Sequence, residues 1–183
     1  MKRKMSLIGV IGILLFLSGC SSALDTVDQL YPMHDLVYDA SGNTSTVFRA
    51  YQSSIKEATN AITEEEEPMK VSNKDSRTVL VYDKYLVQVY QDIENPDDAL
   101  VEVSDEKFVR QNYTSDYFST YNIADAAEEA FDMDLDDREG TDTYYSGYIG
   151  SNGYVKNTGR VPTVRFGSSV ENSVRSGGPG AGK

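Results

Sequence analysis

Four consecutive residues, Leu17-Ser18-Gly19-Cys20, carry the clearest chemistry in this sequence of 183 residues. The thiol of Cys20 is a nucleophile that can accept a lipid, and the small residues Ser18 and Gly19 allow a peptidase to reach the bond before it. An apolar run, Leu7 to Leu17, precedes them, and three basic residues stand before that run. We therefore expect cleavage in front of Cys20 and attachment of a diacylglyceryl group to its sulfur.

This arrangement has the three parts of an export signal, and its end resembles the lipobox of bacterial lipoproteins. The apolar run is too short to span a bilayer as a stable helix, so an uncleaved anchor is the less favoured alternative. Because Cys20 is the only cysteine, we expect no disulfide within the chain and no thiolate metal site. Two or more acyl chains hold a protein firmly at a membrane. The expected location is the extracytoplasmic face of the cell membrane.

The net charge excludes one class of partner. Removal of residues 1–19 would leave 14 basic against 29 acidic residues, a net charge of −15. Binding of nucleic acid depends on neutralising phosphates with Lys and Arg, so we expect no nucleic-acid partner. The charge is also uneven, because residues 116–142 hold ten acidic residues and one Arg, whereas residues 143–183 hold five basic residues and one Glu.

Three further patterns resemble known sites but lack required residues. The segment Asp132 to Asp136 begins like a calcium loop, but Asp137 stands where glycine is needed and Thr143 where a bidentate Glu is needed, so a solvated acidic linker is favoured over loose cation binding. The segment Gly177 to Lys183 has the letters of a phosphate loop without its Ser or Thr or a preceding strand. His34 is the only histidine, which leaves no triad. We expect no catalytic residue, metal ligand or cofactor.

The sequence predicts five strands. Strand formers at 35–39 and 46–51 flank the turn-rich residues 41–43 and predict a hairpin. Two β-branched and aromatic runs within 78–90, followed by 99–103 after an Asn-Pro-Asp-Asp turn, predict three more antiparallel strands.

Helix signals alternate with these strands. A capping box at Ser54 predicts a helix over 54–63, and Ser104 is expected to cap a second helix. A weak helix is predicted over 123–131, and residues 24–30 favour either a short helix or a tether. The expected fold is α+β, a small antiparallel sheet of about five strands with helices on one face.

We expect five segments along the chain. They are the signal peptide (1–19), a lipidated tether (20–33), the α+β domain (34–118), an acidic segment with a weak helix (119–142) and a tail rich in Gly, Ser and Tyr (143–183). Nine of the 14 glycines lie in the tail, and its tyrosines Tyr144, Tyr145, Tyr148 and Tyr154 fit a mobile spacer or a stacking surface equally well. We expect the tail to be disordered.

The motif at Cys20 and four further segments resemble a family of small firmicute lipoproteins that is classed only as a domain of unknown function. The segments are Leu30-Tyr31-Pro32, Tyr82-Asp83-Lys84-Tyr85, Phe108-Val109-Arg110-Gln111-Asn112-Tyr113 and Arg175-Ser176-Gly177-Gly178-Pro179-Gly180-Ala181-Gly182-Lys183. The resemblance implies genes near membrane-stress proteins of the phage-shock type, and hence a role in envelope maintenance. It supplies no catalytic residues.

Two functional hypotheses follow. The first is a non-enzymatic lipoprotein, anchored to the membrane through Cys20, that binds an envelope or membrane protein in envelope maintenance or stress response. The alternative is a wall-associated enzyme, or a receptor for a small ligand or cation, that uses acidic residues and presents a pocket with convergent carboxylates. A structural spacer without a specific ligand is a third possibility.

Overall fold

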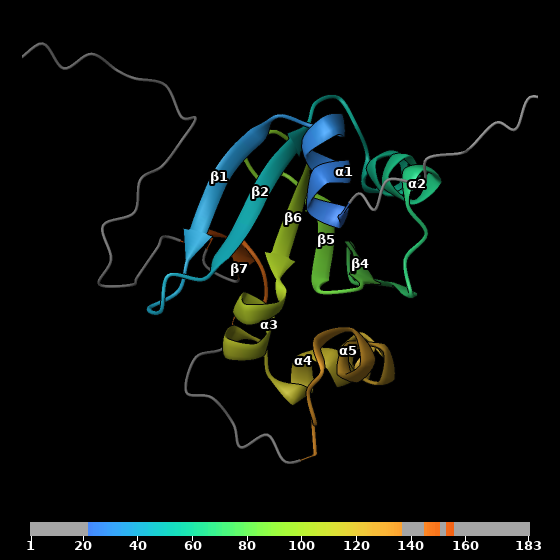
Figure 1. Ribbon diagram of the computed structural model, residues 1–183. Helices are drawn as coiled ribbons and strands as arrows, with labels where there is room; N and C mark the ends of the chain where they lie inside the picture. The colour runs from blue at the N-terminus through green and yellow to red at the C-terminus, as the bar shows by residue number, and fades with distance from the viewer. Residues whose placement is uncertain (1–21, 137–144, 151–152, 156–183) are drawn as a thin grey trace, which may run out of the picture.

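The computed structural model of the protein describes residues 22–136, 145–150 and 153–155 (Figure 1). Six antiparallel strands form one sheet in the order β1-β2-β6-β5-β4-β3. These strands are β1 (Met33–Tyr38), β2 (Thr44–Ala50), β3 (Lys70–Lys74), β4 (Arg77–Tyr82), β5 (Tyr85–Gln91) and β6 (Ala99–Asp105). The helices are α1 (Ala23–Leu30), α2 (Ile55–Glu65), α3 (Glu106–Asn112), α4 (Ser115–Thr120) and α5 (Ala124–Phe131). The predicted α+β fold is confirmed, with one more strand than expected.

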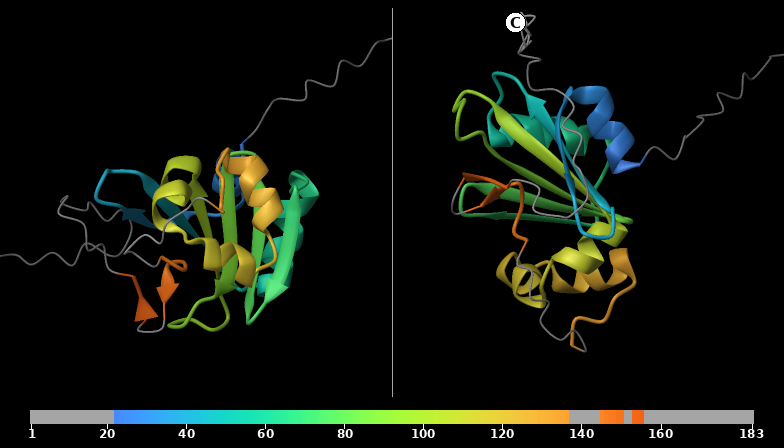
Figure 2. Two further views of the ribbon diagram at one scale, coloured as in Figure 1. Left: turned by 90° about the horizontal axis from the view of Figure 1, so that it is seen from below. Right: turned by 90° about the vertical axis from the view of Figure 1, so that its left-hand side faces the viewer.

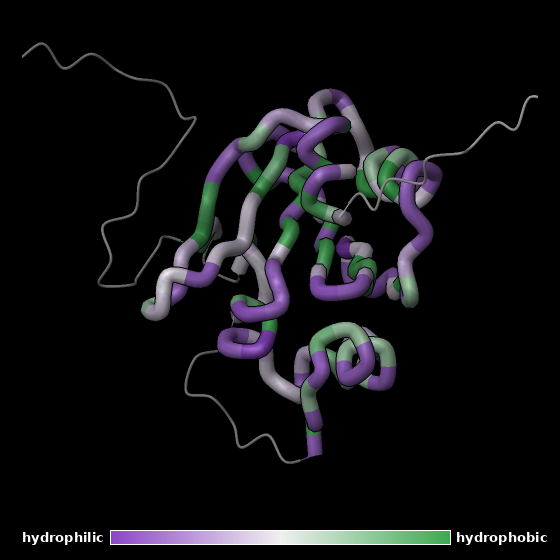
Figure 3. The backbone as a smooth tube through the Cα atoms, viewed as in Figure 1, coloured by the Kyte–Doolittle hydropathy of each residue, from purple (hydrophilic) through white to green (hydrophobic). Residues whose placement is uncertain are grey.

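Helices cover both faces of the sheet, which corrects the expected single covered face. Val79 and Val81 of β4 belong to the core beneath α3, α4 and α5, whereas Leu80 between them belongs to the core beneath α1 and α2. A strand that is apolar on both faces needs a cover on each. The two groups of helices lie in different parts of the molecule (Figures 1 and 2), and hydrophobic stretches concentrate on the strands and their covering helices (Figure 3).

The predicted hairpins and the α2 helix are confirmed. β1 pairs with β2, and β4, β5 and β6 pair in succession. Ser54 caps α2, because its side chain accepts from the backbone N–H of Glu57 while the Glu57 carboxylate accepts from the Ser54 N–H. The strand β3 was not predicted, because most of its residues are polar and exposed and only Val71 is a strong strand former.

The segment expected as a tether begins with a packed helix. Ser22 caps α1 through a reciprocal capping box with Asp25. The side chains of Ala23 and Val27, on the inner face of α1, are buried in the core shared with α2. Of the two alternatives for residues 24–30, a short helix and a tether, the helix is the one present, and the tether predicted over 20–33 is corrected there because the apolar face of α1 covers the sheet.

The cap of α3 also differs from the prediction. Ser104 lies inside β6, is fully buried, and forms hydrogen bonds with Ser45 at 2.8 Å and with Tyr113 at 3.2 Å. Asp105 caps α3 instead, because its Oδ1 accepts from the backbone N–H of Phe108 at 2.8 Å. The strand β6 ends at Asp105, two residues beyond the predicted end at residue 103.

The core extends beyond the predicted domain end at residue 118. The weak helix is confirmed as α5, whose Phe131 is fully buried. Residues 145–150 and 153–155, named here the strap, carry the short strands β7 (Ile149–Gly150) and β8 (Gly153–Tyr154) and bury Tyr148 against the sheet. This part of the predicted disordered tail is packed, and the rest of the tail lies outside the described residues. No helix in the described part is both long and apolar enough to cross a membrane.

Candidate functional site

Glu102 lies in the middle of β6, and its side chain is fully buried. A carboxylate in this position is strongly unfavourable unless hydrogen bonds replace its water. Ser45 Oγ donates to it at 2.7 Å, the Tyr90 hydroxyl at 2.8 Å and the backbone N–H of Tyr148 at 2.8 Å. The Tyr145 hydroxyl donates to Oε1 as well. Both carboxylate oxygens are thus supplied with donors from β2, β5 and the strap.

Gln88 extends this network across the sheet. Its Nε2 donates to the Tyr113 hydroxyl at 2.7 Å, and its Oε1 accepts from the Tyr117 hydroxyl at 2.8 Å and from Arg77 Nη1 at 2.5 Å. Burial raises the pKa of Tyr113 and Tyr117 well above the ordinary tyrosine value, so both hydroxyls stay protonated. The interior on this face therefore holds a connected polar network rather than an apolar core alone.

The strap is tied to the sheet by three tyrosine hydroxyls, each of which donates to a carboxylate. The pairs are Tyr145 with Glu102, Tyr148 with Asp35 and Tyr154 with Asp92. Arg77 adds a cationic contact, because its guanidinium donates to the carbonyl oxygens of Ser146 and Ile149. These roles could not be predicted from local sequence patterns, because each pair joins residues far apart in the chain.

Gly147 permits the close approach of the strap to Arg77. Its φ of +120° is unfavourable for any residue with a side chain, and a Cβ there would lie 2.8 Å from Arg77 Nη1. A glycine inside a segment that looks like a low-complexity tail is therefore a packing requirement.

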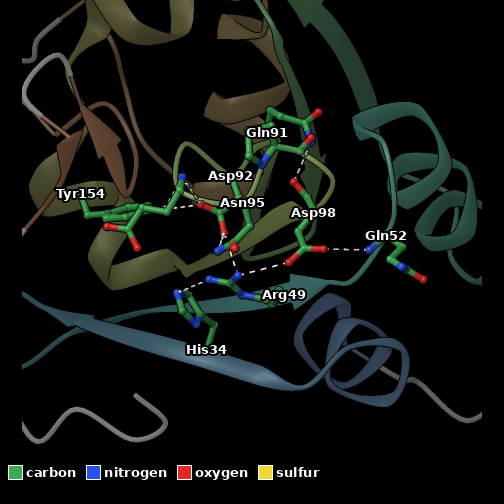
Figure 4. A network of polar contacts seen from close by, with 10 residues as sticks. His34, Arg49, Gln52, Gln91, Asp92, Asn95, Asp98 and Tyr154 are labelled. Atoms are coloured by element: carbon green, nitrogen blue, oxygen red, sulfur yellow. Dashed lines mark hydrogen bonds and ion pairs between the residues drawn. The ribbon is translucent and has the colours of Figure 1, made fainter. Parts of the chain in front are cut away.

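A second polar cluster lies at the end of the sheet where β1 begins and β2 ends (Figure 4). Arg49 Nη1 forms ion pairs with Asp92 at 2.9 Å and with Asp98 at 3.2 Å. Its Nη2 lies 3.1 Å from His34 Nε2. Because a guanidinium only donates, Nε2 accepts and the ring proton is placed on Nδ1. His34 is half-buried in the edge strand β1.

The pKa values in this cluster are shifted by burial and by the neighbouring charges. Burial and the neighbouring Arg49 cation lower the pKa of His34, although Asp35 and Asp92 oppose them. Burial alone would raise the pKa of Asp92, but hydrogen bonds from Tyr154 and the Glu94 backbone, together with Arg49, hold it below the ordinary value. The cluster is therefore a neutral histidine beside a cation held by two carboxylates.

An open groove lies between α2 and the β3–β4 hairpin and has a volume of about 1090 Å³. Ile55, Thr59 and Val71 line it together with three acidic and three basic residues, Glu64, Glu67, Asp75, Lys56, Lys74 and Arg77. The buried carboxylates Asp35, Asp92 and Glu102 do not line it. No group of three or more His, Cys, Asp or Glu residues in the described part of the chain is arranged to hold a metal ion.

A family model described as Domain of unknown function (DUF4247) matches residues 13–183. The chain belongs to this family. The expected membership in a domain of unknown function is thereby confirmed at that level. Comparisons with curated proteins and with solved structures found no match. The DUF4247 match includes Cys20, the described domain and the C-terminal residues.

Several of the residues singled out in the sequence lie outside the described part of the chain. The motif Leu17-Ser18-Gly19-Cys20 and the segment 177–183 lie outside the described residues, as does Tyr144. The acidic run ends in a local turn, where Asp134 Oδ1 accepts from the backbone N–H of Asp136 at 2.9 Å. Glu102 was not singled out, although an acidic residue within an apolar strand signals that buried donors must exist.

We predict that Glu102→Gln lowers the free energy of unfolding by about 3 kcal/mol, because the new amide N–H₂ faces donors instead of accepting from them. Urea denaturation of wild type and variant measures the difference. Glu129→Gln, at an exposed position of α5, serves as the matched control and should change stability little. A Glu102→Gln variant as stable as the control would contradict the role of the network.

We also predict a pH dependence from His34. Its pKa is lowered on folding, so the unfolded state binds more protons, and this contribution to stability is full above the unfolded value of 6.5 and declines as the pH falls toward the folded pKa. His34→Gln cannot titrate, so the stability of wild type relative to the variant should decline from pH 7.5 to 5, in urea denaturation at each pH. Parallel curves would show that burial and the Arg49 contact do not lower the pKa of His34 on folding.

Proposed function

We propose that the protein is a lipid-anchored, extracytoplasmic binding module of the bacterial envelope. The observation that carries this proposal is the position of the motif Leu17-Ser18-Gly19-Cys20 relative to the fold. The described structure begins at Ser22, the N-cap of α1, and Ala23 is already buried. Cleavage before Cys20 would therefore remove no residue of the described domain and would leave the lipid-bearing residue next to it.

The buried carboxylates favour a binding role over catalysis. A general acid or base needs a carboxyl group that can reach a substrate proton. Glu102 instead accepts hydrogen bonds from five surrounding residues, and Asp92 is held by Arg49 and Tyr154, so both carboxylates serve the fold. The alternative function, a receptor or an enzyme, would use the open groove beside α2. The acidic residues of that groove are mixed with an equal number of basic ones.

The binding surface that we propose is the groove together with the free edge of β3. β3 pairs with β4 on one side, and no described strand lies on its other side. Met69 and Val71 are 43% and 42% exposed beside this edge. An extended segment of an envelope or membrane protein can add to such an edge as a further strand, with an apolar side chain in the groove. Lys70 and Lys74 disfavour pairing between identical edges.

Lipidation is tested by labelling growing cells with a radioactive fatty acid. The wild-type chain should incorporate the label and fractionate with membranes, whereas Cys20→Ala should lose the label and accumulate with the 19-residue signal segment still attached. Ser21→Ala is the control and should remain labelled. A wild-type chain without label, or a labelled Cys20→Ala variant, would contradict the proposal.

The β3 edge is tested by comparing two substitutions on opposite edges of the sheet. Val71→Asp should reduce recovery of a cross-linked envelope partner from membranes by about tenfold, since a charge in the groove costs about 1.4 kcal/mol or more of binding free energy. Met33→Asp, on the exposed part of β1, should leave recovery unchanged. Equal losses in the two variants, with both folded, would remove β3 as the binding edge.

A further inference from the structure

We infer that α1 lies directly against the bilayer surface and that the strap faces away from it. This inference rests on the proposed lipidation of Cys20 and goes beyond it, because it fixes how the domain is oriented. The occupant of the α1 surface is the lipid headgroup layer of the membrane that carries the anchor.

The chain between the proposed lipid attachment and the fold is short. Ser22 is held in place because its Oγ donates to Asp25 Oδ2 at 2.8 Å and accepts from the Asp25 backbone N–H at 3.2 Å. Ala23, the next residue, is 1% exposed against the sheet. Only Ser21 separates Cys20 from this fixed residue, and two chain steps span at most about 7 Å. The lipid therefore cannot extend away from the domain on a spacer.

The attachment point and the strap lie on opposite sides of the sheet. α1 packs beside α2 over one face of the sheet, and Thr26 Oγ1 donates to Glu66 at 3.0 Å between the two segments. The strap belongs to the core on the other face, where Tyr148 is buried. Figures 1 and 2 show the strap, coloured orange to red, well away from the start of α1. An anchor of about 7 Å thus brings α1 to the bilayer and leaves the strap on the distal side.

The exposed surface of α1 is acidic and does not itself attract an anionic membrane. Its exposed residues Asp25, Asp28 and Gln29 include two carboxylates and no cation. Anionic lipids repel such a surface within a Debye length of about 8 Å. The lipid on Cys20 is therefore the attractive contact, and the short connection is what makes it sufficient. The arrangement predicts proximity that depends on the length of the connection.

The chain contains no tryptophan, so a single introduced Trp reports its own surroundings. Gln29→Trp marks the exposed face of α1, and Ile93→Trp marks an exposed site, 51% accessible in wild type, beside Gly153 of the strap. The lipidated full-length mature protein is bound to phosphatidylcholine vesicles that carry a nitroxide on the headgroup. We expect a several-fold loss of fluorescence for Gln29→Trp and no change for Ile93→Trp, relative to vesicles without nitroxide.

A flexible Gly/Ser insert of ten residues between Ser21 and Ser22 provides the decisive control. Its end-to-end distance of about 18 Å lets the domain leave the surface, so Gln29→Trp should recover its fluorescence while the fatty-acid label persists. Equal quenching of Gln29→Trp with and without the insert, or stronger quenching of Ile93→Trp than of Gln29→Trp, would overturn the orientation. Absence of the fatty-acid label in the wild type would instead overturn the proposed function, so the two failures are distinguishable.

Discussion

The need to satisfy one buried carboxylate, that of Glu102, organises the fold. Gln88 is its direct cross-strand neighbour in β5, and Ser45 reaches it from β2. A slip of either strand by one residue would turn these side chains to the opposite face and leave the carboxylate without donors. The polar network therefore selects one register among the apolar alternatives, a role that buried polar groups have in some other folds. The strap completes the set through Tyr145 and the backbone of Tyr148.

The cores on the two faces of the sheet differ in composition. Beneath α1 and α2 the core consists mainly of aliphatic side chains, with Phe48 and Leu80 among the largest. Beneath α3 and the strap the core adds seven buried aromatic side chains to its aliphatic ones, and the rings of Phe108 and Tyr145 meet edge to face at 5.1 Å between centroids. Tyrosine suits this side because its ring buries a large area while its hydroxyl reaches a partner. A chain with 13 tyrosines and no tryptophan can thus combine apolar packing with the polar network.

Local sequence patterns predicted most of the helices and strands. The parts of the structure that depend on contacts between distant residues could not be predicted in this way. The hairpins, α2 and α5 follow from strand formers, turns and a capping box, all of which act within a few residues. The strap could not be predicted in this way, because Tyr148 and Asp35 are 113 residues apart and only the folded sheet brings them together. The cap of α3 was misplaced for a related reason, since Ser104 is needed inside β6. An acidic residue within each of two predicted strands, Asp35 and Glu102, was the available signal for a missing set of donors.

The strap also has a consequence for the order of events during biogenesis. A chain that crosses a membrane from its N-terminus presents Cys20 early, whereas Tyr145 and Tyr148 arrive more than 120 residues later. Until they arrive, Glu102 lacks two of its donors and the aromatic side of the core lacks part of its cover. If Cys20 is acylated as proposed, the nascent protein would be fastened to the lipid before its interior closes. Folding would then be completed on the membrane surface rather than in free solution.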